Sequence, residues 1–346
     1  MMVVFGGRSG EHEVSLASAR AIAEALGKSG RHEVVPVGIT REGRWISSGE
    51  PMRELESRSG YLADGSPEVS VPPASAAEKL PAGLGSVDVV FPVLHGPYGE
   101  DGTIQGMLEL AGIPYVGSGV LGSAAGMDKP TMKKIFAHHG LPQVGWVAFT
   151  RKQWEEDREG LREEIERLGY PCFVKPANLG SSVGIRKAEG AGELGEAVDE
   201  AARHDRRIIV EEGIDAREIE VSVLGNEAPD VSVPGEIVIK NNDFYDYEAK
   251  YVEGGMELIA PAPIPDETTR EIRRIARAAF EAIDAAGMAR VDFFLERGTD
   301  RLLLNEINTI PGFTPTSVYA ELWATSGLPY EELLDRLVQL ALERHG

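Results

Sequence analysis

The chain has 346 residues, and its 56 Asp and Glu against 35 Lys and Arg give a formal net charge of −21. This acidity argues against general nucleic-acid binding and against docking on anionic membranes, because both need positive potential. A single cysteine, Cys172, excludes internal disulfides and cysteine-rich metal sites. The length predicts two or three domains. Because no apolar run resembles a signal peptide or a membrane span, the sequence predicts a cytoplasmic protein.

The first hundred residues alternate between strand and helix patterns. Strands are predicted at 2–5, 34–39 and 87–94, and apolar residues recur at helical spacing over 16–26. Such alternation predicts a parallel α/β sheet, whose sites lie at the carboxyl ends of its strands. Residues 60–85 are rich in Pro, Ser, Ala and Gly and are predicted to form a surface loop.

Two further units follow Gly117-Ser118-Gly119, so the predicted domains are 1–118, 119–214 and 215–346. For the second unit we predict helices at 129–139 and 191–204, and strands at 144–149, 172–175, 182–187 and 207–212. For the third we predict strands at 217–225, 233–240, 289–297 and 301–308, a polar aromatic loop at 241–251, and helices at 266–286 and 329–344.

The turn after Lys175 is the first candidate site. Gly180, Ser181 and Ser182 can present backbone N–H groups and hydroxyls to a phosphate. The segment matches neither the Walker A loop nor the dinucleotide fingerprint. A plain hairpin turn explains it equally well.

The segments at 288–294 and 303–308 alternate as strands, which places Arg290 with Asp292 on one face and Glu306 with Asn308 on one face. Gly298-Thr299-Asp300 suits a three-residue hairpin loop.

Pairing of Arg297 with Arg301 across that loop would place Asp292 opposite Glu306 and Arg290 opposite Asn308. Two carboxylates about 5 Å apart repel each other, and Mg²⁺ would resolve the conflict because it prefers oxygen ligands. A solvated hairpin or an Arg290–Asp292 ion pair are the alternatives.

Four loops complete the candidates. The aromatic segment 244–251 suits a lid over phosphates or a loop anchored by tyrosines. Glu13, in the turn at 6–15, is either a ligand residue or a carboxylate stabilised by a helix amino terminus. His95, in the turn at 94–103, is a site residue or a structural histidine. The segment 308–317 has a glycine and hydroxyls that could receive a carboxylate or an oxyanion.

Taken together and in this order, the segments resemble the D-alanine–D-alanine ligases of the ATP-grasp superfamily. The resemblance runs from Gly6 to the end apart from a loop around 50–85, and Gly-Ser-Ser-Val-Gly and Tyr-Asp-Tyr-Glu-Ala-Lys-Tyr are among its motifs. It implies a three-domain α/β ATP-grasp architecture with an N-terminal Rossmann-like parallel sheet domain. ATP would lie between the central and carboxyl-terminal subdomains, under a lid loop at 241–255.

The resemblance also implies residue roles. Lys129, Lys175 and Lys250 would meet ATP phosphates, Glu211 and the Ile214 backbone would bind adenine, and Glu218 would bind ribose. The other residues implied at the ATP site are Ser181, Ser182, Glu212, Phe244 and Phe293.

Asp292, Glu306 and Asn308 would hold two Mg²⁺, for which Mn²⁺ could substitute. Glu13 and His95 would contact the first D-alanine, and Ser317 with the Val318 N–H would hold the carboxylate of the second. Arg290 and the Gly312 N–H would form the oxyanion hole, and Tyr251 would join Ser181 and Glu13 in a hydrogen-bonded chain.

The activity implied is ATP-dependent ligation of two D-alanines through a D-alanyl phosphate, for peptidoglycan precursor synthesis, by a homodimer. The group that deprotonates the incoming ammonium stays open between a phosphate oxygen and the Ser181–Tyr251 chain. A D-alanine–D-lactate ligase and an inactive nucleotide-binding regulator are the alternatives; Tyr251 favours the dipeptide, since depsipeptide-forming relatives tend to carry His there.

Overall fold

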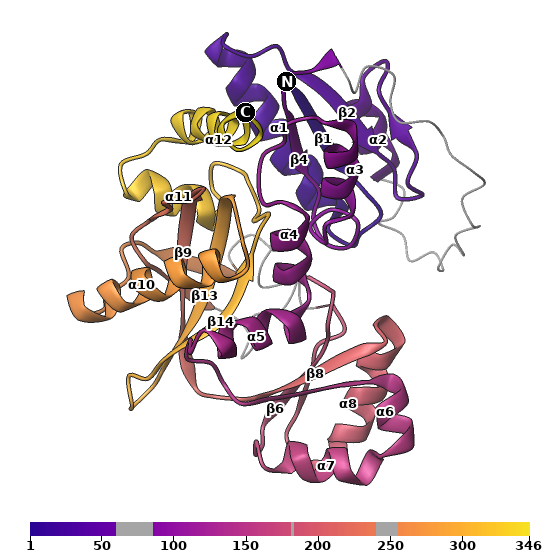
Figure 1. Ribbon diagram of the computed structural model, residues 1–346, viewed down its shortest axis with the longest axis vertical. Helices are drawn as coiled ribbons and strands as arrows, with labels where there is room; N and C mark the ends of the chain where they lie inside the picture. Colours follow the sequence, from indigo (N-terminus) through magenta and orange to yellow (C-terminus); the bar gives the residue numbers. More distant parts are fainter. Residues whose placement is uncertain (60–85, 181–182, 240–254) are drawn as a thin grey trace.

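The computed structural model describes residues 1–59, 86–180, 183–239 and 255–346. Within them the chain forms three sheets, each assembled from its own stretch of sequence (Figure 1). None of the helices in these ranges combines the length and the apolar composition needed to cross a bilayer.

The amino-terminal sheet has the order β3-β2-β1-β4, and β1 is parallel to both β2 and β4, as predicted. The short edge strand β3, which the sequence analysis missed, runs antiparallel to β2. Helices α1 and α2 share a core with one face of the sheet, and α3 packs on the other. The elements are β1 Met2–Gly6, α1 His12–Ser29, β2 Val35–Ile39, β3 Trp45–Ile46, α2 Pro51–Ser59, β4 Val90–Val93 and α3 Thr103–Ala111.

The central sheet has the order β5-β8-β6-β7 with antiparallel neighbours. Helices cover one face of it, around Trp154, Ile165 and Val198. A capping box starts α6, in which Thr150 and Gln153 satisfy each other's backbone N–H groups. The elements are β5 Trp146–Thr150, α6 Arg151–Glu156, α7 Arg158–Glu166, β6 Cys172–Pro176, β7 Arg186–Ala188, α8 Ala191–His204 and β8 Arg207–Glu212.

The carboxyl-terminal sheet has the order β12-β11-β9-β13-β14, with β10 paired to β9. Its strands are β9 Ala216–Gly225, β10 Asp230–Val231, β11 Gly235–Ile239, β12 Met256–Ile259, β13 Gly287–Glu296 and β14 Leu302–Asn308. Its helices are α10 Asp266–Ala282, α11 Val318–Thr325 and α12 Tyr330–His345. The long helices and strands therefore match the prediction, whereas α2, α4, α6, α7, α11, β10 and β12 were not predicted.

Helices α4 (Val120–Met127) and α5 (Lys129–His138) follow the glycine-rich junction at Gly117. Their buried residues Met132 and Phe136 share a core with α10 and β13 rather than with the central sheet. Lys133 of α5 also contacts Glu211 of β8, so the helix lies between the carboxyl-terminal and central sheets.

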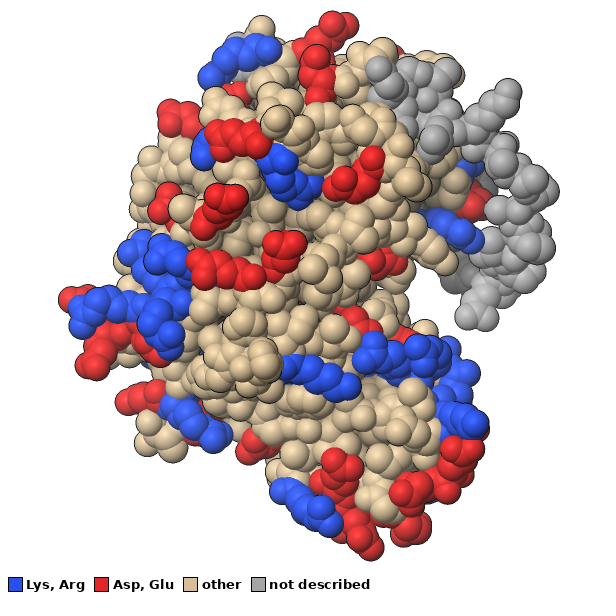
Figure 2. Space-filling view, viewed as in Figure 1, with Lys and Arg blue, Asp and Glu red and all other residues tan. Residues whose placement is uncertain are grey.

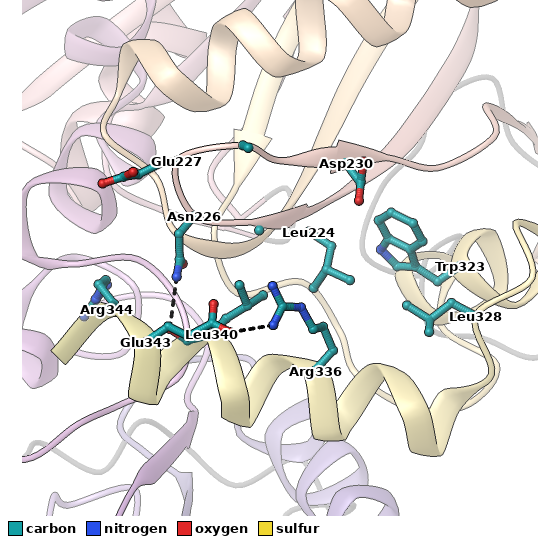
Figure 3. A pocket seen from close by; sticks show the side chains of 12 residues that line it. Leu224, Asn226, Glu227, Asp230, Trp323, Leu328, Arg336, Leu340, Glu343 and Arg344 are labelled. Atoms are coloured by element: carbon teal, nitrogen blue, oxygen red, sulfur yellow. Dashed lines mark hydrogen bonds and ion pairs between the residues drawn. The ribbon is translucent and has the colours of Figure 1, made fainter. Parts of the chain in front are cut away.

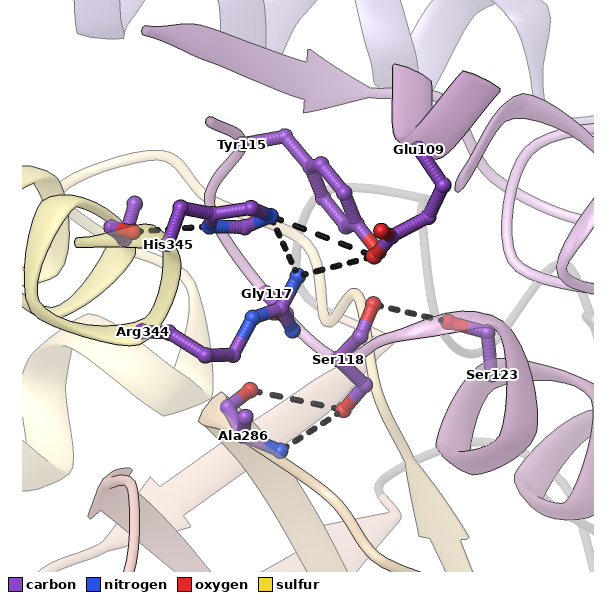
Figure 4. A network of polar contacts seen from close by, with 9 residues as sticks. Glu109, Tyr115, Gly117, Ser118, Ser123, Ala286, Arg344 and His345 are labelled. Carbon is purple, nitrogen blue, oxygen red and sulfur yellow. Dashed lines mark hydrogen bonds and ion pairs between the residues drawn. The ribbon is translucent and has the colours of Figure 1, made fainter. Parts of the chain in front are cut away.

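The last helix, α12, lies against α1 of the amino-terminal unit (Figure 1), and the two share a hydrophobic core. A polar network fixes its end (Figure 4): Arg344 Nη1 donates to the Gly117 carbonyl at 2.7 Å. The Arg344 guanidinium lies 4.4 Å from the centre of the Tyr115 ring, whose hydroxyl donates to Glu109 at 2.7 Å. The carboxyl-terminal helix is therefore bound to the amino-terminal unit along its length.

Acidic and basic side chains are interspersed over the face in Figure 2. The arginines of α10 gather on its left, near the carboxyl-terminal sheet. On this face the excess negative charge therefore forms no single large patch.

Candidate active site

A pocket of about 420 Å³ lies between the central and carboxyl-terminal sheets. The apolar part of its lining comes from Phe173 of β6, Ile237 and Ile239 of β11, and Phe294 of β13. Five predicted nucleotide residues line it as well: Lys175, Glu211, Glu212, Ile214 and Glu218. A slot lined by both apolar and charged side chains suits a flat ligand with polar substituents.

A buried row of charges runs along one side of this pocket. Lys175 Nζ donates to Glu211 Oε2 at 2.6 Å, and Lys133 Nζ lies 3.2 Å from Glu211 Oε1. Burial raises the pKa of Glu211, but the charges of Lys133 and Lys175 outweigh it and lower that pKa to about 2. Glu211 is therefore an ionised acceptor at neutral pH. Lys133 was not singled out from the sequence.

On the carboxyl-terminal sheet, three carboxylates stand in register across three strands. Asp292 of β13 lies opposite Glu306 of β14 and opposite Glu220 of β9. The Arg290 guanidinium is held between two of them, with 2.8 and 2.6 Å hydrogen bonds to Asp292 and a 2.9 Å ion pair with Glu220. The predicted juxtaposition of Asp292 and Glu306 is confirmed, and so is the Arg290–Asp292 ion pair that was the alternative to a metal site.

The predicted hairpin pairing was wrong at its turn. Glu296, not Arg297, pairs with Arg301, because Glu296 N donates to the Arg301 carbonyl. A register shift between Asp292 and Phe293 restores the predicted register nearer the site. A bulge places an extra residue in one strand. The one-residue error in the predicted pairing at the turn is therefore compensated at the bulge, and Asp292 pairs with Glu306 as predicted.

The chemistry of this donor set fits Mg²⁺ in part. Asp292 and Glu306 supply opposed carboxylates, the donors that Mg²⁺ prefers. The Asn308 amide oxygen already accepts from Ile310 N at 3.0 Å. Within the described ranges, no three His, Cys, Asp or Glu side chains converge as a ready metal cage. Any ion here would share Asp292 with Arg290.

The amino-terminal unit contributes His95, which is 4% exposed. Its Nδ1 donates to the Ile310 carbonyl at 2.9 Å, whereas Nε2 is buried without a hydrogen-bond partner among the described residues. Burial lowers the pKa of His95, and Glu11 acts against it. Nearby, burial followed by the Glu11 charge raises the pKa of Glu100 well above its usual range. A neutral imidazole with an open nitrogen can bind a polar substrate group.

The segment that follows β14 is held by the amino-terminal unit. Phe313 N donates to Ser18 Oγ of α1 at 3.1 Å, and the Phe313 ring packs edge-on against Phe91. The segment leads into Val318, the first residue of α11, whose helix amino terminus carries N–H groups that suit an anion. The Ser317 hydroxyl contacts Thr314 Oγ1 at 2.8 Å.

Two family models match most of the chain. The model described as D-ala D-ala ligase N-terminus matches residues 1–118, and the model described as D-ala D-ala ligase C-terminus matches residues 135–339. The chain belongs to the D-alanine–D-alanine ligase family.

Curated members of the D-alanine–D-alanine ligase family are similar over nearly the whole chain. A D-alanine--D-alanine ligase from Thermoanaerobacter sp. (strain X514) is 51% identical over 99% of this chain and 96% of its own. One from Bacillus cytotoxicus is 50% identical over 99% of this chain and 95% of its own.

Solved structures of the family share the fold at a TM-score of 0.81 and 36% identity. One is the D-alanine-D-alanine ligase from Coxiella burnetii, matched over 99% of this chain and 94% of that one. Another is the VanG D-Ala:D-Ser ligase from Enterococcus faecalis, matched over 98% of each chain. The ATP-grasp fold predicted for the chain is confirmed, and the family implies ATP use.

Two residues implied by the ligase family resemblance lie away from the groups described above. Glu13 is half exposed and pairs with Arg41 at 2.9 Å. Glu11 instead lies near His95, and a Cβ built on Gly180 would be 2.7 Å from its carboxylate. Phe293 packs in the hydrophobic core, while its neighbour Phe294 faces the pocket, as strand alternation requires.

Lys129 and Gly312, also implied by the resemblance, lie beside other residues of the candidate site. Lys129 Nζ donates to the Leu179 carbonyl at 2.8 Å, beside the Gly180 turn. Gly312 lies near Ser317, whose Oγ would be 3.5 Å from a Cβ built on Gly312. Five implied ligase residues fall outside the described ranges: Ser181, Ser182, Phe244, Lys250 and Tyr251.

A different pocket, of about 640 Å³, lies between α12 and the turn joining β9 to β10 (Figure 3). None of the implied ligase residues lines it. Asn226 crosses it, donating to the Leu340 carbonyl at 3.0 Å and accepting from Gly287 N at 3.2 Å. These bonds fix α12 to the sheet and have no part in the candidate active site.

Proposed function

We propose that the chain joins two D-alanines to D-alanyl-D-alanine at the expense of ATP, through a D-alanyl phosphate, in the cytoplasmic synthesis of peptidoglycan precursors. The observation that carries the proposal is the adjacency of two charge clusters. Lys175 lines the pocket between two sheets, and Glu306 of the neighbouring hairpin acts electrostatically on it. The names of relatives about 50% identical favour dipeptide formation over the alternatives.

The proposed reaction has two steps, formation of the D-alanyl phosphate and attack on it by the second D-alanine, and the residues match the physical demands of both. Phosphoryl transfer needs positioning and neutralisation of negative charge, which Lys129 and Lys175 would supply together with Lys250. Attack of the second amine on the acyl phosphate creates an oxyanion, for which Arg290 and the Gly312 N–H would be the donors. The Ser317 hydroxyl and the Val318 N–H would hold the second carboxylate.

Mg²⁺ would be held by Asp292, Glu306 and Asn308, two ions in all, with Mn²⁺ as a substitute. When bound, it would neutralise phosphate charge and align the γ-phosphate with its attacker. In that state we expect Glu220 to remain as the anionic partner of Arg290, since the two are 2.9 Å apart.

The remaining site assignments are also proposals. Glu211, Glu212, Ile214 and Glu218 line the pocket and would bind the base and ribose; Ser181, Ser182, Phe244 and Tyr251 would contact nucleotide or close the site within a lid at 241–255. We propose domains 1–118, 119–214 and 215–346, each of which contains one of the three sheets.

We also propose a homodimer, supported by an apolar face on the contacting helices α3 and α4. Leu110 is 94% exposed there, and Leu121 is 63% exposed. Large apolar side chains exposed on neighbouring helices are common at subunit contacts.

For the ammonium of the first D-alanine, the geometry favours Glu11 over Glu13. Glu11 lies between His95 and the Gly180 turn, where two structural units meet, whereas Glu13 pairs with Arg41 at the surface. The Glu11 carboxylate, near a neutral His95, can bind the ammonium of the first D-alanine. The carboxyl group of that D-alanine then stays free to react.

Glu11→Gln is therefore expected to raise the KM for the first D-alanine at least about tenfold, because a charged hydrogen-bond partner contributes roughly 1.5–3 kcal/mol. The matched variant Glu13→Gln, two residues away, should change that KM by less than about twofold, as exposed ion pairs contribute little. Initial rates at varied D-alanine measure both. A larger effect in Glu13→Gln would restore the assignment to Glu13.

The test of the function is product analysis with ATP, Mg²⁺ and D-alanine, alone and with D-lactate or D-serine. We expect D-alanyl-D-alanine and one phosphate released per dipeptide. A preference for D-lactate at neutral pH would identify a depsipeptide ligase. Absence of phosphate release under all conditions would leave a nucleotide-binding regulator.

A further inference from the structure

Lys133 of α5 is a buried cation to which the proposed reaction gives no role. It is 1% exposed, and its Nζ lies 3.2 Å from Glu211 Oε1. The same Nζ donates to the Asn305 carbonyl at 3.3 Å. Burying an ammonium is costly unless charged and hydrogen-bonding partners surround it, so Lys133 depends on these two contacts.

Glu211 is held at both carboxylate oxygens. Lys175 binds Oε2 at 2.6 Å from the pocket side, and Lys133 binds Oε1 from the α5 side. Rotation of the carboxylate about its last bond would break at least one contact, so the two lysines together fix its plane. Of the two lysines, Lys175 lines the pocket and Lys133 does not.

The second contact of Lys133 reaches the hairpin of the proposed metal site. Asn305 lies in β14 at the register shift beside Asp292, and the next residue is Glu306. One ammonium thus ties α5 to β8 of the central sheet and to β14 of the carboxyl-terminal sheet. It can influence a pocket ligand only through the groups it holds, since it does not line the pocket.

Glu211 is a buried acceptor in the wall of the pocket. The side chain is 3% exposed, and the flanking walls are the apolar Phe173, Ile237 and Phe294. The two lysines keep Glu211 ionised, with a pKa of about 2, and an ionised carboxylate only accepts hydrogen bonds. At position 6 an amino purine donates to it, whereas a 6-oxo purine presents an oxygen there and is repelled, although the 6-oxo purine carries an N1–H donor at the neighbouring position.

We propose that Lys133 is a positioning residue for base selection: by fixing the Glu211 carboxylate it makes the site prefer a 6-amino purine over a 6-oxo purine. The inference rests on the proposed placement of the nucleotide in this pocket. The quantity to measure is the ratio of the affinities for the two kinds of purine. If Lys133 had only a structural role, replacing it would not change that ratio.

The experiment is equilibrium binding of ADP and IDP, which differ in the group at position 6 and in the proton on N1, measured by calorimetry with Mg²⁺ present. Wild type should bind ADP at least about tenfold more tightly, as expected for a hydrogen bond to a charged group. Lys133→Met should lose most of this preference. The matched control is Lys134→Met, since Lys134 is the next residue of α5 and is exposed; it should keep the wild-type ratio.

A double-mutant cycle tests whether Lys133 acts through Glu211. In a Glu211→Gln background the preference is already weakened, and adding Lys133→Met should change the ADP/IDP ratio no further. A further loss of similar size would overturn the proposed route. Thermal unfolding of every variant confirms that binding is measured on folded protein.

Lys133→Arg covers the case in which Lys133→Met does not fold. Lys133→Arg retains the charge but replaces a compact ammonium with a planar guanidinium. We therefore expect the preference for ADP over IDP to fall about threefold. An unchanged ratio in a folded Lys133 variant would overturn the role of Lys133 alone. A wild-type protein that binds ADP and IDP equally would instead overturn the nucleotide placement on which the inference rests.

Discussion

Arg290→Ala is expected to lower turnover by about 10²- to 10³-fold, the usual cost of losing an oxyanion donor, while nucleotide affinity changes by less than about threefold. The guanidinium lies in the carboxylate row of β13 and does not line the nucleotide pocket. Its loss should therefore act on the ligation step rather than on ATP binding. Steady-state rates and ADP calorimetry measure the two effects separately.

Stability needs its own control in this experiment. Removing Arg290 leaves Asp292 and Glu220 facing each other without the cation that binds both, which should lower the melting temperature. Arg290→Lys keeps a positive charge near Asp292 and Glu220, so it should recover part of the stability. It should recover little turnover, because an ammonium does not present its donors to the oxyanion with the geometry of the planar guanidinium. Full activity in a folded Arg290→Ala protein would remove Arg290 from the oxyanion role.

Glu306→Gln is expected to raise the Mg²⁺ concentration for half-maximal activity at least about tenfold and to lower turnover at saturating Mg²⁺ about 100-fold, in keeping with the value of a catalytic metal. Glu306 is one of two carboxylates opposed across β13 and β14, and Mg²⁺ depends on such oxygen ligands. Mg²⁺ titration of ADP binding gives a second readout that does not depend on activity.

Glu296→Gln is the matched control for this variant. Glu296 lies at the far end of the same hairpin, where it pairs with Arg301, and its replacement should leave the Mg²⁺ dependence unchanged. If Glu306→Gln and Glu296→Gln respond alike to Mg²⁺, the metal site lies elsewhere in the protein.

Long helices and strands with a clear hydrophobic period were predicted correctly from the sequence, whereas short elements were missed. Helix α8 and strand β8 have their predicted bounds, because each is a clear apolar pattern between polar or glycine-containing segments. Strand β3 has only two residues, too few for a period to be recognised. The hairpin of β13 and β14 was placed in the correct register at Asp292 only because a bulge compensated for the misjudged turn.

The candidate site was predictable for residues that motifs mark, but less so for residues defined by burial. Lys133 and Lys134 are adjacent lysines in one helix, and sequence does not say which is buried; only packing of α5 between two sheets distinguishes them. The core position of Phe293 was predictable, because alternation places it on the opposite face of β13 from Arg290 and Asp292.

The shared core of α1 and α12 has a consequence for the order in which the protein can fold during synthesis. Leu16, Ile22 and Leu26 of α1 belong to the same cluster as Leu333, Leu337 and Leu340 of α12. The ribosome completes α1 more than three hundred residues before it completes α12. Although domains generally fold as units from the amino end, this first unit cannot cover that face until the last helix has left the ribosome. Helix α1 is therefore synthesised long before its apolar face can be fully buried.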